Sequence, residues 1–481
     1  MPHTRGNLQK HRNPEGQSRA PAYATAAVMG MGFVFSMAAN LPGTLSYDSV
    51  IQLLEGRTGV YSGWHPPVMS WLLGLSDWVI PGAALFVVAV TLLFFASLLS
   101  LLWLVPRVSW TAPAVTALAM LTPQVLLYQG IVWKDVLFAD SAVAAFAVLA
   151  HLSLRWANPR LRYALIAGAA LCLTLAALTR QNGIVLLPFA AFALGWIACR
   201  NERSCRLGWI AAAAFCACVV VLVAAASALF ALRTAPERGM GKEIRILEFY
   251  DLNGALAREP NLQLPQLARR DPKLFALMRS DGRSLYSPVR SDTLAQSQRL
   301  QAALAQAPDN ILHRPWLDFV LHHPSLYLRE RAQVFRWVLL TPDISLCVPY
   351  VVGFSGPQLA MDELGFRTRV SPRDKAMDRY GRLLMHTPLF LHVTFLLLAI
   401  FEIVFLLWRR RGTDIVFVAM LTGAIMFCAS FFFISLACDY RYFYVLDLTA
   451  LTALIYIALS PIRPSLFRDS PSSITPEGQG T

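Results

Sequence analysis

Charged and aromatic residues gather in five short segments, each next to a long apolar run. The segments are Tyr47-Asp48-Ser49, the stretch from Tyr61 through Trp64-His65 to Pro67, Trp133-Lys134-Asp135, Arg180-Gln181-Asn182, and Asp439-Tyr440-Arg441-Tyr442. A carboxylate or a histidine could accept a proton from a hydroxyl group, and the cations could stabilise an anionic leaving group. Charges near hydrocarbon are costly, so their presence indicates a substrate pathway or a reaction site.

The apolar runs predict a membrane protein. The 481-residue chain is 56% hydrophobic and 15% charged, whereas soluble domains have about 45–50% and about 25%, which excludes an ordinary cytosolic enzyme. A helix crosses the hydrocarbon core with about 20 apolar residues. Ten runs are near this length, at residues 22–41, 82–105, 112–130, 135–154, 162–179, 183–199, 207–232, 387–408, 414–437 and 442–460. We therefore expect an all-α polytopic membrane protein with about ten transmembrane helices.

Basic residues predict how the spans are oriented. With the N-terminus inside, the cytoplasmic tails and short loops hold 16 of the 42 Lys and Arg residues, and the opposite short loops hold four, Arg57, Lys134, Arg180 and Arg441. This asymmetry follows the positive-inside rule, from which the long outer segment with the other 22 is exempt. Of the net charge of +13, the long outer segment contributes +6, with 22 basic and 16 acidic residues. Most of the remaining +7 is a topological signal on the cytoplasmic side, and no nucleic-acid partner is implied. We expect a bacterial inner-membrane protein with both termini in the cytoplasm.

The spans and the segments between them predict five parts of the chain. They are a cytoplasmic tail (1–21) before a retained anchor, an N-terminal transmembrane module (22–232), a periplasmic and interfacial, mainly helical segment (233–386), C-terminal transmembrane helices (387–460) and a disordered cytoplasmic tail (461–481). The first outer loop, residues 42–81, is expected to hold a surface helix and an apolar helix of interfacial length.

Each charged segment also has a simpler explanation. Asp48 could cap a helix, and Asp135 could complement a helix dipole. His65 could end a loop, and lone arginines could extend to lipid headgroups. A site is favoured because the outer short loops carry few other charges, only Glu55, Arg57 and Asp77.

Three acidic residues, Asp140, Glu402 and Asp447, lie inside apolar spans. Asp140 follows Lys134 by the same interval as Asp447 follows Arg441, so we expect each to support its cation; Glu402 has no assigned role. His313, His322 and His323 lack the Cys or carboxylate spacing of a metal site. Cys347 and Cys438 fall near the outer face and could pair in an oxidising compartment, but the sequence alone does not bring them together.

Taken together, these motifs resemble those of the GT-C superfamily of membrane glycosyltransferases, such as the protein O-mannosyltransferases and the bacterial aminoarabinose transferases. The matching features are Asp48 after the first span, Trp64 to Pro67 in the first outer loop, Lys134-Asp135 before the fourth span, Arg180 to Asn182, and Arg441-Tyr442. The resemblance covers the first 200 residues well and is thin between Arg233 and His386. The chain lacks the Trp-Trp-Asp motif of oligosaccharyltransferases, and Ser49 stands where many relatives have a second carboxylate. No cofactor is therefore firmly implied, and dependence on a divalent cation is in doubt.

The resemblance implies an inverting glycosyltransferase that moves a sugar from a polyprenyl phosphate to a lipid, glycan or protein acceptor at the periplasmic face, among the membrane lipids. It gives Asp48 the role of general base, and lets Asp135 orient Lys134 or the acceptor and His65 contact phosphate or sugar. Lys134, Arg180 and Arg441 would bind the donor phosphate. The residues that would line the sugar or lipid are aromatic, namely Tyr47, Tyr61, Trp64, Trp133 and Tyr442, although aromatic belts at membrane interfaces are common.

Two other functions fit the same composition. A transporter or flippase of lipid-linked glycans would place polar groups at mid-bilayer on several helices. An O-antigen ligase or polymerase would place its working residues in the large outer segment, where Arg329, Arg331, Arg336, His322 and His323 are the candidates.

Overall fold

The structure is a computed structural model that describes residues 19–62, 65–202, 204–234 and 242–461. Every named element in these ranges is a helix, joined by a few isolated β-bridges, which confirms the all-α class. Nine of the described helices are long and apolar enough to cross a membrane. They are α1 (Ala20–Asn40), α4 with η2 (Ala84–Leu104), α7 (Lys134–Arg155), α8 (Pro159–Thr179), η4 with α9 (Gln181–Asn201), α10 (Cys205–Ala231), α20 (His392–Arg409), α21 (Asp414–Ile434) and η9 with α22 (Tyr440–Leu459).

The continuous span expected at 112–130 is instead broken. Helix α5 (Thr111–Met120) and the short pieces α6 (Pro123–Leu126) and η3 (Tyr128–Gly130) meet at an angle of 62°. Pro123 explains the break, because proline lacks an N–H donor and forces the preceding residue, Thr122, into an extended conformation. The bent pair counts as the tenth span if its two parts cross together.

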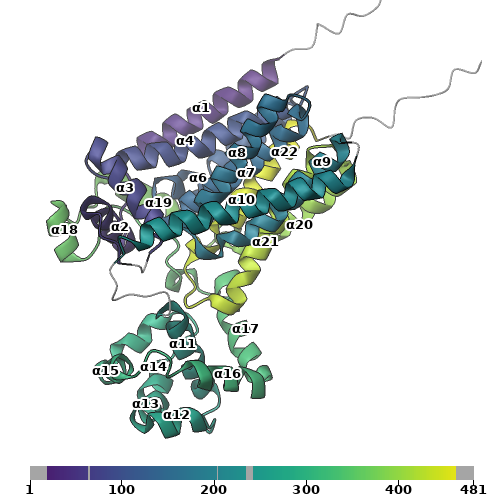
Figure 1. Cartoon of the computed structure of the whole chain (residues 1–481). Coiled ribbons are helices and arrows are strands. Elements are labelled where there is room, and N and C mark those ends of the chain that lie inside the picture. Colours follow the sequence, from purple (N-terminus) through teal and green to yellow (C-terminus); the bar gives the residue numbers. More distant parts are fainter. Residues whose placement is uncertain (1–18, 63–64, 203, 235–241, 462–481) are drawn as a thin grey trace, which may run out of the picture.

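Helices α7 and α22 form the centre of the bundle. In each of them 83% of the residues in an apolar stretch of 18 residues are buried inside the protein. The corresponding share for α10 is 11%, so α10 lies at the periphery. Helix α7 packs against α8, α4 and α22 (Figure 1). The two most buried spans therefore begin at two of the charged segments, Lys134-Asp135 and Tyr440-Arg441.

The first outer loop holds the two helices that the sequence predicts, α2 (Tyr47–Thr58) and α3 (Pro67–Val79). They pack closely because Gly56 and Gly74 face each other. A Cβ atom added to Gly56 would lie 2.0 Å from the Ser70 carbonyl oxygen, so any larger residue would push the helices apart. This contact fixes the orientation of α2, whose first turn carries Asp48.

The outer segment has two parts. Helices α11 (Lys242–Arg258), α12 (Pro265–Arg270), α13 (Pro272–Leu277), α14 (Arg283–Leu285), α15 (Gln298–Gln306) and α16 (His313–His322) form a lobe with its own apolar core (Figure 1). Helix α17 (Pro324–Leu340) leads from this lobe back to the bundle. Helices α18 (Gln358–Leu364) and α19 (Pro372–Leu384) then lie against α2 and α1, respectively.

Candidate functional site

A cluster of charged residues lies where the outer ends of α7, α8 and α22 meet α2, and Arg441 is at its centre. The Arg441 guanidinium places Nη1 2.8 Å from Asp48 Oδ2 and Nη2 3.1 Å from Asp439 Oδ2. Its Nε lies 3.9 Å from Asp135 Oδ2, and its central carbon lies 5.1 Å from the centre of the Trp133 ring. One guanidinium thus joins three carboxylates that come from three parts of the chain.

Two backbone segments that lie side by side bring Asp48 close to Asp135. The Thr44 N–H donates to the Gly130 carbonyl at 2.8 Å, and the Val132 N–H donates to the Thr44 carbonyl at 3.0 Å. The Trp133 indole N–H donates to Ser46 Oγ at 2.9 Å. Since Ser46 occupies the N-cap position of α2, the carboxylate of Asp48 is left to contact Arg441.

Arg180 forms a second ion pair in the cluster. It follows α8 directly, and its Nη2 donates to Asp135 Oδ1. The guanidinium also lies over two aromatic rings, 5.0 Å from Tyr442 and 5.4 Å from Phe431. Asp135 is almost fully buried, so Arg180 supplies the positive charge that a buried carboxylate requires.

Lys134 differs from the other two cations. Within the described residues, its ammonium group makes no hydrogen bond and no ion pair within 4.0 Å, although it is close enough to influence the pKa values of Asp48 and His65. It is half-buried at the first position of α7. Among the described residues, Arg180 and Arg441 form ion pairs with carboxylates, and Lys134 does not.

His65 lies beside Asp48, with Nε2 3.8 Å from Asp48 Oδ1. Burial and the charge of Lys134 lower the pKa of His65 to about 4, against the opposing effect of Asp48. The imidazole is therefore neutral at pH 7. Its Nδ1 is buried and has no hydrogen-bond partner among the described residues.

Asp48 keeps its negative charge despite its burial. Burial raises its pKa, but Arg441, His65 and Lys134 together lower the pKa by more, so the net pKa lies below the ordinary value. Burial raises the pKa of Asp439, which Arg441 only partly opposes. The sequence assigned no separate role to Asp439, which contacts Arg441 two residues further along the chain.

The aromatic candidates lie in different places. Trp133 is buried beneath Arg441, and Tyr442 packs on Arg180. Tyr47 is 61% exposed next to Asp48. Tyr61 packs edge-on against Phe230, with ring centres 5.8 Å apart, and pairs with Thr234 rather than with the charged cluster. Trp64 lies outside the described residues.

The expected support of the cations by acids inside the spans is not seen. Asp140 accepts a hydrogen bond from Gln129 Nε2 at 2.9 Å instead of contacting Lys134. Asp447 lies 2.9 Å from His392 Nδ1 and accepts a hydrogen bond from the Tyr440 hydroxyl at 2.8 Å.

Asp447 therefore contacts Tyr440, the residue before Arg441, and not Arg441 itself. His392 also lies 2.9 Å from the Tyr440 carbonyl oxygen through Nε2. The sequence reasoning missed His392, because nothing in its local pattern indicates a partner 55 residues away.

Among the described residues, no group of three or more His, Cys, Asp or Glu side chains could hold a metal ion. The carboxylates of the cluster contact arginines instead.

No family model and no curated protein matches this sequence. Among solved structures, the chain is similar to the archaeal oligosaccharyltransferase AglB from Archaeoglobus fulgidus, in a complex with an inhibitory peptide and a dolichol-phosphate. The identity is 12% and the TM-score 0.40, over 91% of this chain and 50% of that chain. The apo form of the Archaeoglobus fulgidus enzyme gives 13% identity and a TM-score of 0.40, again over 91% and 50%. The present chain spans about half the length of these proteins.

Proposed function

We propose that this protein is an inverting glycosyltransferase that takes a sugar from a polyprenyl phosphate at the outer face of the membrane. The observation that carries the proposal is the ion pair between Asp48 and Arg441, 2.8 Å apart, beside the uncommitted Lys134. It places a candidate base next to cations suited to a phosphate, at the ends of membrane-spanning helices.

In the proposed reaction, the acceptor hydroxyl gives its proton to Asp48 while its oxygen attacks the anomeric carbon. The bond between that carbon and the phosphate oxygen breaks, and its electron pair leaves with the polyprenyl phosphate. Attack from the face opposite the leaving group inverts the configuration. Lys134 and Arg441 would offset the negative charge that develops on the leaving phosphate.

The charges of the cluster suggest how Asp48 becomes a better base. In the free protein its pKa is lowered chiefly by Arg441, against the effect of burial. A bound phosphate would share the guanidinium and weaken that effect, so the pKa of Asp48 would rise. The base would therefore gain proton affinity when the donor is in place.

The other residues take roles that follow from their positions. Arg180 is tied to Asp135 and so is better suited to order the cluster than to move toward a ligand. His65 lies beside Asp48 and could contact sugar or phosphate. Tyr47, Trp64 and Tyr442 are proposed to line the sugar or lipid, whereas Trp133 supports Arg441 from below.

We further propose that the protein belongs to the GT-C superfamily and lies in a bacterial inner membrane with both termini in the cytoplasm. The module at 22–232 and the C-terminal spans at 387–460 would hold the donor. The outer segment at 233–386 would select the lipid, glycan or protein acceptor.

The candidates for the two alternatives differ in their surroundings. Of the outer residues named for a ligase, Arg331 is fully buried and bonded to the Ser435 carbonyl, whereas the others are exposed, namely Arg329, Arg336, His322 and His323. Of the acids inside the spans, Asp140 and Asp447 are bonded to neighbouring side chains, whereas Glu402 is buried with no hydrogen-bond partner among the described residues. We favour the transferase because the candidate base and the cations gather around Asp48 and Arg441.

A transfer assay tests the proposal. Purified full-length protein is mixed with membranes from a deletion strain and with polyprenyl phosphates that carry different radiolabelled sugars. We expect label to enter the lipid, glycan or protein fraction as polyprenyl phosphate is released. Movement of label between leaflets without its transfer would identify a flippase instead.

A further inference from the structure

Residues 435–441 form a short strap that joins α21 to α22 and presents Asp439 and Arg441 to the charged cluster. The strap is not held by the membrane helices alone. Three kinds of contact tie it to the outer segment at 233–386, namely side-chain bonds from an arginine, backbone hydrogen bonds and a disulfide.

Arg331 of α17 holds the beginning of the strap. Its two terminal nitrogens each donate to the Ser435 carbonyl oxygen at 2.9 Å, and Nη2 also lies 3.2 Å from Asp251 Oδ1. The side chain of Arg331 is fully buried. A buried arginine with a paired charge and two bonds to one carbonyl fixes the backbone at that point.

Backbone hydrogen bonds hold the middle of the strap. The Ser291 N–H donates to the Leu436 carbonyl at 2.8 Å, and the Cys438 N–H donates to the Val289 carbonyl at 2.9 Å. Arg290 and Ala437 form a β-bridge between these two bonds. The strap is thus paired along its length with residues 289–291.

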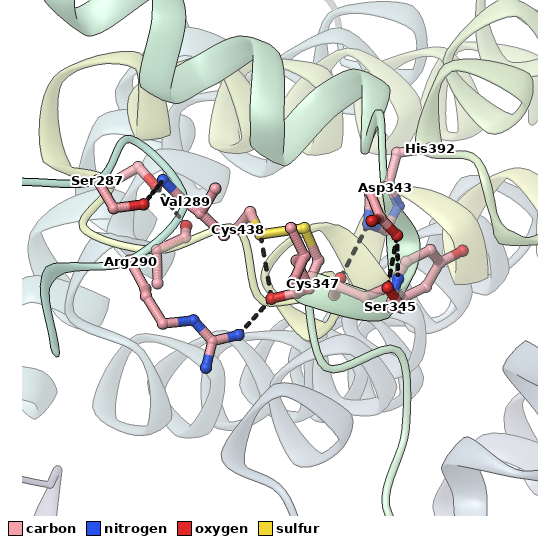
Figure 2. The surroundings of a disulfide bond; sticks show 12 residues. Ser287, Val289, Arg290, Asp343, Ser345, Cys347, His392 and Cys438 are labelled. Carbon is pink, nitrogen blue, oxygen red and sulfur yellow. Dashed lines mark hydrogen bonds between the residues drawn. A yellow bond between two sulfur atoms is a disulfide. The ribbon is translucent and has the colours of Figure 1, made fainter. Parts of the chain in front are cut away.

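A disulfide and one more backbone bond hold the end of the strap. Figure 2 shows the Cys347–Cys438 disulfide, which links the outer segment to the strap three residues before Arg441. Both cysteines are buried. The next anchored residue is Tyr440, whose N–H donates to the Cys347 carbonyl oxygen at 2.8 Å. The sequence left open whether Cys347 and Cys438 pair, and in the structure they form a disulfide.

We propose that the outer segment positions Arg441, with Arg331 and the Cys347–Cys438 disulfide as its positioning residues. These contacts fix the strap backbone on both sides of Asp439, so that the guanidinium stays beside Asp48. A phosphate-binding group that is held in place before the donor arrives binds it more tightly, because less conformational freedom is lost on binding. The catalytic consequence rests on the proposed function, whereas the order of the strap can be measured without it.

The first test removes the disulfide from the full-length protein with the double substitution Cys347→Ser and Cys438→Ser. The matched control is Cys199→Ser with Cys205→Ser, which changes two cysteines at the other end of α9 from Arg180, on the predicted cytoplasmic side. Hydrogen–deuterium exchange is measured on peptides that cover the strap. We expect exchange at the amides of residues 438 and 440 to accelerate by about tenfold in the first variant only.

Donor kinetics supply the second readout. Loss of the link should raise KM for the donor by about tenfold, while kcat changes by less than about threefold, because a bound phosphate orders Arg441 again. A variant that is merely less stable would show a lower melting temperature without this division between KM and kcat. The control pair should leave KM unchanged.

A second pair of variants keeps the test decisive if the cysteine variant does not fold. Lysine at position 331 can still donate to the Ser435 carbonyl and balance Asp251, whereas glutamine cannot balance that charge. We therefore expect Arg331→Lys to keep slow exchange in the strap and a nearly normal KM, and Arg331→Gln to lose both.

Two outcomes separate the proposals. If wild-type protein transfers no sugar, the proposed function fails, and the exchange experiment alone decides whether the outer segment orders the strap. If exchange and KM in the Cys347 and Cys438 variant match those of the Cys199 and Cys205 control, the positioning proposal is overturned.

Discussion

The guanidinium of Arg441 lies 2.8 Å from the carboxylate of Asp48, although the two residues come from opposite ends of the chain. Asp48 belongs to a helix of the first outer loop, and Arg441 lies at the start of the last span. Their contact therefore depends on the whole bundle being assembled. It also gives each residue a partner of opposite charge.

Arg441 should require its guanidinium as well as its charge. Lysine offers a compact charge in place of the planar fork by which Arg441 contacts Asp48 and Asp439, so we expect Arg441→Lys to lower kcat/KM for the donor by about 10²-fold. The matched control is Arg57→Lys, because Arg57 pairs with Asp77 at 2.7 Å outside the cluster. Steady-state transfer rates of both variants test this prediction. Equal losses of kcat/KM in the two variants would contradict the requirement for a guanidinium at position 441.

Lys134 should affect donor binding more than stability. Since it makes no ion pair in the described part of the chain, we expect Lys134→Gln to leave the melting temperature nearly unchanged and to raise KM for the donor by about tenfold. Lys273→Gln, an exposed lysine of α13, serves as the control. A large fall in melting temperature for Lys134→Gln would show that the residue is structural.

Arg180→Gln should behave differently from Lys134→Gln. Its removal leaves the buried Asp135 without its closest positive partner, so we expect both a lower melting temperature and a loss of transfer. The loss of stability should be about 3–5 kcal/mol, the usual cost of breaking a buried ion pair. Combining Arg180→Gln with Asp135→Asn should recover part of the stability but not the transfer, and thermal unfolding of the double variant checks this.

His65 should make the protein less stable as the pH falls below neutrality. The folded protein holds the pKa of His65 at about 4, whereas the unfolded chain has the ordinary value of 6.5. Between these values the unfolded chain binds a proton that the folded site excludes, so unfolding becomes easier as the pH decreases. The effect is at most about 3 kcal/mol. Asp48 titrates below this window and does not obscure it.

Thermal unfolding at pH 7 and pH 5 measures this effect. We expect wild-type protein to lose more stability between these two values than His65→Gln, which cannot take up the proton. Equal losses in the two proteins would mean that His65 is as accessible to protons in the folded protein as in the unfolded chain.

The orientation of the spans can be tested with two exposed positions. Tyr47 is 61% exposed beside the cluster, and Arg160 is exposed at the start of α8, at the other end of the bundle. In intact cells, a membrane-impermeant maleimide should label Tyr47→Cys above the background of the unsubstituted protein. Arg160→Cys should be labelled only after lysis, and the reverse pattern would overturn the predicted topology.

The helices were predictable because membrane spans follow from local composition. All ten apolar runs correspond to helices, and only the run at 112–130 differs, since Pro123 breaks it. The association of Asp48, Asp135, Arg180 and Arg441 could be inferred only as a shared membrane depth. Which atoms meet depends on packing between distant segments, such as the pairing of Thr44 with Gly130.

The remaining partners could not be predicted for the same reason. His392 lies 55 residues from Asp447, and Cys347 lies 91 residues from Cys438, with no local pattern that links either pair. Tyr61 is an aromatic residue of the first outer loop like Tyr47, but it packs on Phe230 of α10. Neighbouring positions in a sequence motif therefore do not ensure a place in the site.

Transfer by Asp48→Asn tests the central claim most directly. Asparagine keeps the size of the side chain and removes its ability to accept the acceptor proton. The control is Asp77→Asn, because Asp77 is an outer carboxylate that also pairs with an arginine. With purified full-length proteins and a radiolabelled polyprenyl-phosphate sugar, we predict that Asp48→Asn binds the donor but transfers its sugar at least about 10²-fold more slowly, while Asp77→Asn remains active. Transfer by Asp48→Asn at the wild-type rate would contradict the account.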